Sequence, residues 1–561
     1  MKVLPKTEIL LLGLGAAGGI AAHVLTAAGR KVVALEAGES LSSKDFIKDL
    51  DEFSAGSMRN RMGDKLVNRT VPSWRPNKDT PTSAPRYAYP TMNGVGGSSV
   101  HYGAASWRYY PGDFSVRTNT VERYGEDALP DGSALADWPV SYEELEPYYD
   151  KVEYAIGVSG DSSGNPFEGA RSRPFPMPPL RRKGWNEMAH GKFEELGYHP
   201  FPQPAAINSQ PYGGRAACSY CGFCSQFGCW NDSKGSTLVT TIPLAVQSGY
   251  LEIRSGCRVT RILSDEDGKA TGVRYVDASG EECEQPALIV ILSMFVYENV
   301  RRLLLSKSER FPNGLANNHG QVGRNFMTQT YVIVNGQYDG VDVKPFNGAG
   351  AQATVIEDFY GDNFDHEGLG FIRGANIATF SEARPIGAAM GKPPHVPSWG
   401  PEYKKWLHEG ARSVCGIFAQ MEVLPYDANY LDVDPEKLDD FGEPSLRVTY
   451  DLYENEHRMA AFLEEKLTEM HRKMGASHVW TALRGPPTPW YAHVFGGTRM
   501  GADPETSVVN GLGFAHEVPN LAILGSSQFP STTGRNPTQT LQALAWRTAD
   551  YINENFERLC A

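Results

Sequence analysis

The sequence predicts an α/β fold (α+β overall), with a Rossmann-like domain and a second domain built on a mainly antiparallel sheet. Three observations support this prediction. A strand–glycine–helix–strand unit begins almost at the N-terminus. Several later segments alternate apolar and polar residues, as half-buried strands do. The chain also has 561 residues, which is longer than a single domain usually is.

The N-terminal unit has the pattern of a dinucleotide-binding site. The apolar run Ile9–Leu12 suits a buried parallel strand, and a GxGxxG motif at Gly13, Gly15 and Gly18 opens an Ala-rich helix. The first glycine permits a tight turn, the second lets backbone amides approach a pyrophosphate, and the third lets helix and strand pack closely. The alternative is a glycine turn that serves packing alone.

The next strand completes this unit. Lys31–Leu35 is largely apolar and ends at Glu36, whose carboxylate can accept hydrogen bonds from ribose hydroxyls. An acidic residue at this position favours an unphosphorylated ribose. Strand, glycines, helix, strand and acid together span about thirty residues, as such a unit should.

A second glycine-rich loop follows a polar stretch, Leu41 to Pro90, which we expect to cross the surface. Small residues leave the backbone amides of this loop unobstructed, so it suits a second cofactor contact. An ordinary glycine turn is the alternative. The residues concerned are Gly94, Gly96, Gly97, Ser98 and Ser99.

Composition limits the classes of function. The chain has 41% hydrophobic and 21% charged residues, as globular proteins do, and its net charge of −13 argues against a nucleic-acid partner or an anionic membrane surface. It contains no run of eighteen apolar residues, and the N-terminal apolar run belongs to the dinucleotide unit. We therefore expect no membrane span and no signal peptide of its own, so export would depend on a partner that carries the signal.

The second loop continues as Val-His-Tyr-Gly and Gly-Ala-Ala-Ser-Trp-Arg-Tyr-Tyr-Pro-Gly-Asp-Phe, followed later by Asp-Trp-Pro-Val-Ser-Tyr-Glu-Glu-Leu. Together with the N-terminal unit, these stretches resemble the glucose–methanol–choline (GMC) oxidoreductase family, whose members bind FAD and oxidise alcohols. They are most similar to flavoprotein subunits of bacterial sugar dehydrogenases, the group of gluconate 2-dehydrogenase, fructose dehydrogenase and FAD-glucose dehydrogenase.

The resemblance implies a set of FAD contacts. The loop from Val95 to Gly103 would contact the isoalloxazine, and Val259 would hold the adenine through its backbone. In some relatives a histidine placed like His101 is bonded covalently to the flavin, and this stays open here. The family usually has an Ala-Gly-Ala-Ile-type turn where this chain has Ser293-Met-Phe-Val. The implied cofactor-binding residues are Gly13, Gly15, Gly18, Glu36, Gly96, Gly97, Ser98, Ser99, His101, Val259, Gly525, Ser526 and Pro537.

Four of the eight cysteines fall in one short segment, at Cys218, Cys221, Cys224 and Cys229. An iron–sulfur cluster suits such closely spaced thiolates best. Structural zinc usually takes two knuckles with a longer spacer, disulfides suit small secreted scaffolds, and unligated thiols are the remaining alternative. Several sugar dehydrogenases of the resembled group carry a three-iron, four-sulfur (3Fe-4S) cluster in this segment, which needs three thiolates and would leave one spare. We expect no shared role for the other four cysteines, which include Cys283.

Two C-terminal segments match the family's catalytic pattern. One has the form His-x-x-Gly-Thr-x-Arg-Met-Gly from His493, departing only at Gly497, where the family usually has Thr; the other contains Arg-Asn536-Pro. The resemblance implies that His493 lies opposite the flavin N5 with Asn536 beside it. A neutral imidazole can accept the proton of an alcohol as its carbon gives up hydride, and an amide can donate to the same oxygen. A buried structural histidine and an Asn-Pro turn are the alternatives.

Local patterns predict further elements. Ser141 suits the N-cap of a helix within Trp138–Ile156, and the Gly-, Ser- and Pro-rich stretch Gly160–Pro179 suits a loop. Alternation or continuous apolar character predicts strands in 251–263, Ala287–Ser293, Tyr331–Gln337 and Arg447–Leu452, and helical periodicity predicts helices at Val296–Leu305, Asn455–Met474 and Leu541–Ile552.

The predicted domains are discontinuous. Residues 1–110, 205–328 and 491–561 would form the FAD-binding domain, with the cysteine segment 218–229 attached to it. Residues 111–204 and 329–490 would form the substrate domain and its crossovers.

We therefore expect an FAD-dependent dehydrogenase that oxidises a hydroxyl of a sugar, sugar acid or glycoside by hydride transfer to flavin N5 and passes electrons through the cluster to an external acceptor. One alternative is an oxidase that uses oxygen and has structural cysteines. A non-catalytic flavin electron-transfer subunit is another, against which His493 and Asn536 argue. The resemblance implies a bacterial protein with a small subunit and a cytochrome c acceptor. It would work at the periplasmic face of the inner membrane if a partner subunit exports it, and in the cytoplasm otherwise.

Overall fold

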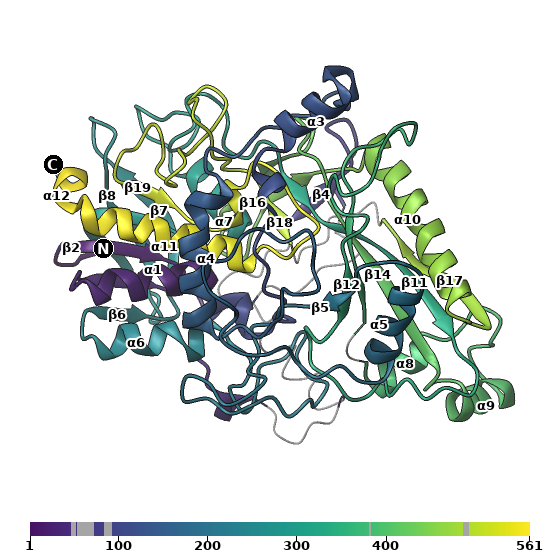
Figure 1. The fold of residues 1–561 in the computed structure, drawn as a ribbon. Helices are drawn as coiled ribbons and strands as arrows, with labels where there is room; N and C mark the ends of the chain where they lie inside the picture. The colour runs from purple at the N-terminus through teal and green to yellow at the C-terminus, as the bar shows by residue number, and fades with distance from the viewer. Residues whose placement is uncertain (47–51, 53–71, 84–91, 381–382, 486–492) are drawn as a thin grey trace.

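The computed structural model describes residues 1–46, 52, 72–83, 92–380, 383–485 and 493–561. Two large sheets, at the left and the right of Figure 1, form the frame of the molecule, with helices packed on both. The predicted α/β fold with a mainly antiparallel second sheet is confirmed. Tyr491 and most of the predicted surface stretch from Leu41 to Pro90 lie outside the described residues.

The first sheet has eight strands and contains the N-terminal unit. Its parallel part places β2 between β3 and β9, and β9 continues into the antiparallel meander β7–β8–β9. The predicted Ile9–Leu12, Lys31–Leu35 and Ala287–Ser293 strands are all present within it. The strands are β1 (Lys2–Val3), β2 (Thr7–Leu12), β3 (Val32–Leu35), β6 (Leu251–Arg254), β7 (Arg258–Ser264), β8 (Ala270–Val276), β9 (Glu282–Leu292) and β19 (Leu521–Ile523).

Three helices stack in front of this sheet in Figure 1: α1 (Ala16–Ala27), α11 (Thr538–Glu554) and α4 (Tyr142–Ile156). Helix α11 lies between the other two, so a helix near the C-terminus packs on the first helix of the chain. Helix α4 begins as predicted, because the Ser141 hydroxyl accepts a hydrogen bond from the Glu144 amide at 3.2 Å and the Glu144 carboxylate accepts one from the Ser141 amide. A shorter helix, α6 (Thr241–Gln247), also contacts α1.

The second sheet has six strands, all paired antiparallel. One face is covered by α10 (Glu454–Lys473), whose apolar residues pack against Val332, Val334, Ile417 and Ala419. Because side chains alternate along a strand, Tyr331, Ile333, Phe418 and Gln420 point to the opposite face. In order, the strands are β17 (His478–Arg484), β11 (Thr330–Gln337), β14 (Val414–Met421), β13 (Ala375–Thr379), β12 (Thr354–Ile356) and β5 (Phe201–Pro202).

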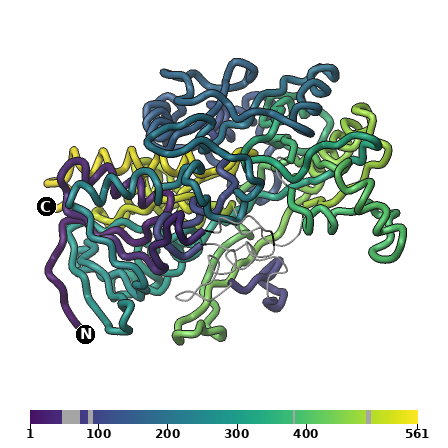
Figure 2. The backbone as a smooth tube through the Cα atoms, turned by 90° about the horizontal axis from the view of Figure 1, so that it is seen from below, coloured from purple at the N-terminus to yellow at the C-terminus, as the bar shows by residue number. Residues whose placement is uncertain are grey.

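A small three-stranded sheet projects from the body in Figure 2, where the hairpin is green and its third strand purple. It consists of β15 (Tyr430–Leu438), β16 (Pro444–Thr449) and β4 (Ser73–Arg75). The sequence pattern did not indicate β4, which has three residues and lies in the polar stretch. Two further strands, β10 (Met327–Thr328) and β18 (Val494–Phe495), pair with each other. The remaining α-helices described are α3 (Val116–Tyr124), α5 (Trp185–Glu195), α7 (Phe295–Leu305), α8 (Pro385–Met390), α9 (Pro401–Glu409) and α12 (Phe556–Cys560).

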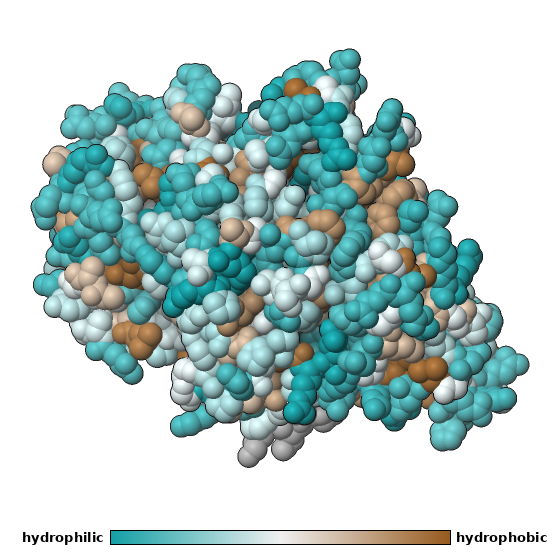
Figure 3. All heavy atoms as spheres, in the orientation of Figure 1, coloured by the Kyte–Doolittle hydropathy of each residue, from teal (hydrophilic) through white to brown (hydrophobic). Residues whose placement is uncertain are grey.

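The surface is mostly hydrophilic on the face seen in Figure 3, with apolar residues scattered among polar ones. Among the described helices, none combines the length and the apolar character that a membrane crossing requires.

A buried ion pair ties the C-terminal loop to the second sheet. Glu357, which directly follows β12, is fully buried and accepts hydrogen bonds from Nε and Nη2 of Arg535, with 2.7 Å between Nε and Oε1. The amides of Asn165 and Asn376 donate to the same carboxylate, at 3.1 and 3.0 Å. The pair is satisfied on both sides, which a buried charge pair needs if it is not to destabilise the fold.

We expect Glu357→Ala to lower the stability of the protein by about 3–5 kcal/mol, because it leaves the Arg535 guanidinium buried without its partner. The thermal midpoint of the purified protein would show this loss. Glu409→Ala is the control, since it breaks an exposed pair with Lys405 at 3.9 Å that should contribute almost nothing. Equal thermal midpoints for the two variants would contradict the assignment.

Candidate active site

A cavity of about 660 Å³ lies between the cofactor-type loops of the first sheet and the uncovered face of the second. Its wall on the first side includes Gly13, Gly15 and Glu36, and on the second side Tyr331, Phe418 and Gln420. His493 and Asn536, the two predicted catalytic residues, both border it. The fold thus brings segments from both ends of the chain to one enclosed space.

The first glycine loop has the shape that its motif predicts. Gly13 has a φ of +88°, and a Cβ on it would lie 2.4 Å from the backbone oxygen of Ser293. Gly15 caps α1 and borders the cavity, while a Cβ on Gly18 would lie 2.2 Å from the oxygen of Gly13. Gly18 therefore permits close packing and does not itself face the cavity.

Glu36 lies at the end of β3 with its side chain buried against the cavity. Its two carboxylate oxygens accept hydrogen bonds from the backbone amides of Leu14, at 2.9 Å, and Gly38, at 3.0 Å. Burial raises the pKa of this carboxyl above its ordinary value, and the backbone donors oppose the shift. The acid is therefore fixed beside the glycine loop, where a ribose of a dinucleotide would lie.

The second glycine loop touches the first. A Cβ on Gly97 would lie 2.8 Å from Cα of Gly15, so the second loop tolerates no side chain at this contact. Ser98, Ser99 and His101 border the cavity. Gly96 does not: it has a φ of +92° and lies against Leu238 behind the wall, where it shapes the turn.

The remaining predicted cofactor contacts also reach the cavity, namely Val259, Gly525, Ser526 and Pro537. The turn that departs from the family pattern borders it too, through Ser293, Met294 and Phe295. Phe295 has a φ of +68°, a left-handed conformation that a bulky residue rarely adopts. The chain thus keeps the turn against the cavity with larger side chains than the family usually has.

The two predicted catalytic residues form part of a chain of four hydrogen-bonded side chains. Nε2 of His493 lies 3.2 Å from Nδ2 of Asn536, and Nδ1 of His493 lies 3.0 Å from the Tyr331 hydroxyl. At the other end, the indole nitrogen of Trp107 donates to Oδ1 of Asn536 at 3.2 Å. The backbone oxygen of His493 also accepts a hydrogen bond from the backbone amide of Gln329, at 3.1 Å.

The indole fixes the direction of these bonds, because it is a donor only. Oδ1 of Asn536 must therefore face Trp107, so that Nδ2 faces His493 as a donor. Nε2 of His493 is then the acceptor, and in a neutral imidazole the proton lies on Nδ1 and points to the Tyr331 oxygen. This tautomer leaves a lone pair on Nε2, toward Asn536.

The imidazole is also neutral at physiological pH. Withdrawal from bulk water lowers the pKa of His493 to about 4, because the charged form loses its hydration. A neutral Nε2 at the wall of the cavity can accept a proton, which is what general-base catalysis requires.

Comparison with known proteins identifies the family of the chain. Residues 185–331 and 425–545 match the N- and C-terminal segments of GMC oxidoreductases. The gluconate 2-dehydrogenase flavoprotein of Pantoea cypripedii is 33% identical over 99% of this chain and 94% of its own length. The chain belongs to the GMC oxidoreductase family. It is therefore a flavoprotein oxidoreductase that acts on alcohol or sugar hydroxyl groups, and the predicted resemblance is confirmed.

Other members of the GMC family align over almost the whole chain. The 2-methyl-1,2-propanediol dehydrogenase of Mycolicibacterium austroafricanum is 32% identical over 98% of this chain and 96% of its own length. The fructose dehydrogenase large subunit of Gluconobacter japonicus is 27% identical over 98% of both chains. Among solved structures, formate oxidase shares the fold with a TM-score of 0.63 at 16% identity, covering 99% of this chain and 100% of its own.

The cysteine segment of this GMC oxidoreductase lies directly behind the cavity. Ser225 borders the cavity, and the backbone amide of Gln226 donates a hydrogen bond to the backbone oxygen of His101 at 2.6 Å. The Lys234 ammonium, itself buried, donates to the backbone oxygens of Tyr102, Cys224 and Phe227 at 2.9, 2.7 and 2.7 Å. Lys234 therefore clamps the cysteine segment onto the second glycine loop.

The four thiols of this segment are partly or fully buried and form no disulfide. The pKa of Cys218 is raised to about 11, mainly by burial, and the neighbouring Cys229 and Cys221 act in the same direction. In the described part of the chain, no three of the four sulfur atoms lie within 4.8 Å of one another.

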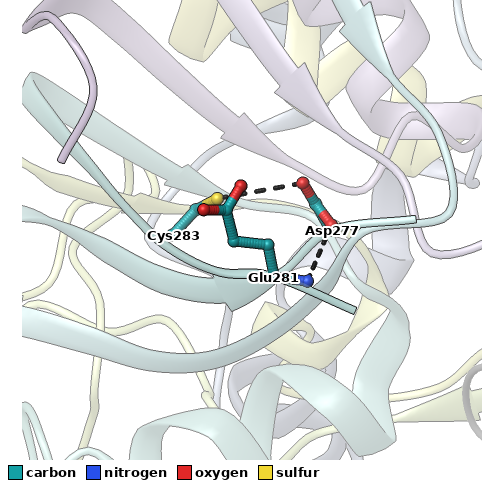
Figure 4. Close-up of side chains that lie close together, drawn as sticks. All are labelled: Asp277, Glu281 and Cys283. Atoms are coloured by element: carbon teal, nitrogen blue, oxygen red, sulfur yellow. Dashed lines mark hydrogen bonds between the residues drawn. The ribbon is translucent and has the colours of Figure 1, made fainter. Parts of the chain in front are cut away.

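One group with metal-type ligand atoms does occur away from the cavity, in the turn between β8 and β9 (Figure 4). Asp277, Glu281 and Cys283 have ligand atoms within 4.8 Å of one another. Oδ1 of Asp277 accepts hydrogen bonds from the amides of Ser279 and Glu281, at 2.8 and 3.0 Å. These bonds stabilise the turn, and we assign the group no further role.

Sequence reasoning found His493 and Asn536 but gave no role to Trp107, Tyr331 or Lys234. Trp107 and Tyr331 lie in stretches that were recognised for other reasons, as part of the family resemblance and as the start of a strand. The alternation of that strand pairs Tyr331 with Ile333 on one face, which was the only signal available for it.

We expect Trp107→Phe to release the Asn536 amide, which could then rotate and present Oδ1 to His493. Part of the protein would adopt the tautomer with a proton on Nε2, and flavin reduction by substrate would slow by about tenfold, the effect of one hydrogen bond. Nitrogen NMR of labelled histidine would show the second tautomer. Trp138→Phe is the control, because it removes an indole bond to Ser531 at 2.8 Å in the same loop. A single, unchanged tautomer in Trp107→Phe would show that the indole does not set it.

Proposed function

We propose that the chain is an FAD-dependent dehydrogenase that oxidises a hydroxyl group of a sugar, sugar acid or glycoside. The observation that supports this most strongly is the oriented His493–Asn536 pair inside a cavity whose opposite wall is built from two touching glycine loops. The named relatives include dehydrogenases for gluconate and fructose, which supports a sugar-type substrate.

FAD fits the cavity on the evidence of its walls. A side chain at Gly13 or Gly97 would collide with neighbouring backbone, so these glycines let the backbone segments meet. Glu36 lies where its carboxylate can accept hydrogen bonds from ribose hydroxyls. The amino end of α1 faces the same space and favours a pyrophosphate. When bound, FAD would supply the hydride acceptor.

The side chains of the chain itself would handle the proton. The substrate hydroxyl would displace the Asn536 amide from the lone pair on Nε2 of His493 and lose its proton to that atom. Asn536 would then donate to the substrate oxygen as negative charge develops there. The Nδ1–H bond to Tyr331 would hold the imidazole in place throughout, and the pKa of about 4 would keep it neutral beforehand.

We further propose that Cys218, Cys221, Cys224 and Cys229 bind an iron–sulfur cluster, of the 3Fe-4S type, which passes electrons to an external acceptor. The contact of their segment with His101 and Tyr102 supports this, because it joins the thiols to the cofactor wall. A small subunit and a cytochrome c would be the partners, and a relative described as a large subunit agrees with this.

His493→Ala should slow anaerobic flavin reduction by sugars about 10²–10⁴-fold, the usual contribution of a general base. The flavin content should not change, because the imidazole serves the substrate. In the parent protein the rate should stay constant as the pH falls to about 5 and drop only near pH 4, where His493 gains a proton. Stopped-flow measurements across pH would check both points. His516→Ala is the control, since His516 lies outside the cavity; a parent-like rate for His493→Ala would refute the assignment.

Replacing Cys218, Cys221, Cys224 and Cys229 by Ser should abolish bound iron and inorganic sulfide. Flavin reduction by substrate should persist, while electron transfer to an external acceptor should slow, because the cluster lies after the chemical step. Elemental analysis and acceptor assays would measure these effects, with Cys283→Ser as the control. Zinc or no metal in the parent protein would instead favour an oxygen-using oxidase with structural cysteines.

A further inference from the structure

On the uncovered face of the second sheet, one amide has no hydrogen-bond partner among the residues that the structure describes. Gln420 of β14 borders the cavity and is only 4% exposed, and its amide nitrogen is buried without a hydrogen bond to any described residue. A buried amide in this state costs free energy, so native proteins rarely keep one without a reason. A ligand in the cavity would supply the missing partner.

The position of Gln420 is fixed by strand register. It lies directly opposite Tyr331 of β11 on one side and Asn376 of β13 on the other. Facing residues of antiparallel strands are about 4.5–5.5 Å apart, and Tyr331 is the residue whose hydroxyl contacts His493. The Asn376 amide is already occupied by Glu357 at 3.0 Å. In this row of three side chains, Gln420 is the amide left for a ligand.

The loop that carries Asn536 also contacts β14 at Gln420. A Cβ on Gly534 would lie 3.0 Å from the backbone oxygen of Gln420, so this loop packs directly on β14. Gln420 is therefore adjacent both to the partner of His493 and to the loop of Asn536, close to where the reacting hydroxyl must lie.

The next row of side chains on this face is apolar. Phe418 lies opposite Ile333, two residues along from the Gln420–Tyr331 pair, and its ring centre is 6.2 Å from that of Tyr331. An aromatic face beside a single amide suits a ring that is apolar on one face and carries hydroxyl groups at its edge.

We propose that Gln420 binds a second oxygen of the substrate, a hydroxyl on the carbon next to the one that is oxidised. The substrate class is then a compound with vicinal hydroxyl groups, as in a pyranose or another polyol. The amide can both donate to and accept from such a hydroxyl. This inference rests on the proposed function, because His493 and Asn536 locate the reacting hydroxyl.

A simple alcohol would leave this amide unpaired. Sites built to hydrogen-bond a substrate hydroxyl discriminate strongly against analogues that lack it, because the buried group of the protein then has no partner. Gln420 would therefore determine specificity, and the pairing of His493 with Asn536 would provide the chemistry.

The test compares Gln420→Met with the parent protein, using trans-cyclohexane-1,2-diol and cyclohexanol as substrates in anaerobic flavin reduction. The parent should reduce its flavin with the diol and prefer the diol by roughly tenfold or more. Methionine keeps the volume but has no amide, so the preference for the diol should fall by roughly 2- to 12-fold, the range for one neutral hydrogen bond. Gln337→Met on β11 is the matched control and should keep the parent ratio, because its amide bonds Asp339 and lies outside the cavity.

Stability provides a second measurement. The thermal midpoint of the substrate-free protein should hold or rise in Gln420→Met, because the variant removes an unpaired buried amide. A lower midpoint with an equal loss on both substrates would mean that Gln420 is only structural. An unchanged preference, or a parent flavin that the diol does not reduce, would also overturn the inference. Failure of the proposed function is recognised separately, by a parent-like rate of His493→Ala with sugars.

Discussion

The buried pair of Arg535 and Glu357 is the contact on which the active-site geometry depends. Arg535 immediately precedes Asn536, and Glu357 directly follows a strand of the second sheet, so their bond fixes the C-terminal loop to that sheet. The Asn376 amide joins the same carboxylate from the next strand. A charge pair this deeply buried tolerates little displacement, because either charge alone would be very unfavourable. The contact therefore fixes the loop that presents Asn536 to His493 and Trp107.

A rigid loop would still leave the imidazole with two possible tautomers. Trp107 removes that ambiguity through a property of its chemistry, since an indole nitrogen can only donate. The enclosed cavity adds the second condition by lowering the pKa of His493, so that the residue is neutral and its lone pair is available. Burial alone would give a neutral imidazole of undefined orientation, and the hydrogen bonds alone would not keep it unprotonated in mild acid.

Much of the frame was predictable because its signals are local. The glycine motif, the capping box at Ser141 and the periodicity of α10 each depend on a few neighbouring residues, and the structure contains all three elements. His493 and Asn536 were found through family resemblance, and both reach the cavity. Tyr331, Trp107 and Gln420 were not predicted, because their importance comes from strand register and from contacts between distant segments. Along the sequence, Gln420 is an ordinary polar residue in a strand, and β4 is too short to show any period.

The cysteine segment was recognised in the sequence, but its location in the fold could not be predicted. Its spacing was visible in the sequence, but its place behind the cavity depends on contacts of Gln226 and Lys234 with the second glycine loop. Lys234 puts a buried ammonium against the backbone of Cys224, and a positive charge there would favour thiolates, since opposite charges stabilise each other strongly where water is excluded. One loop from His101 to Gly103 thus forms a wall of the cavity on one side and the support of the thiols on the other. A substitution that shifted this loop would alter both sites together.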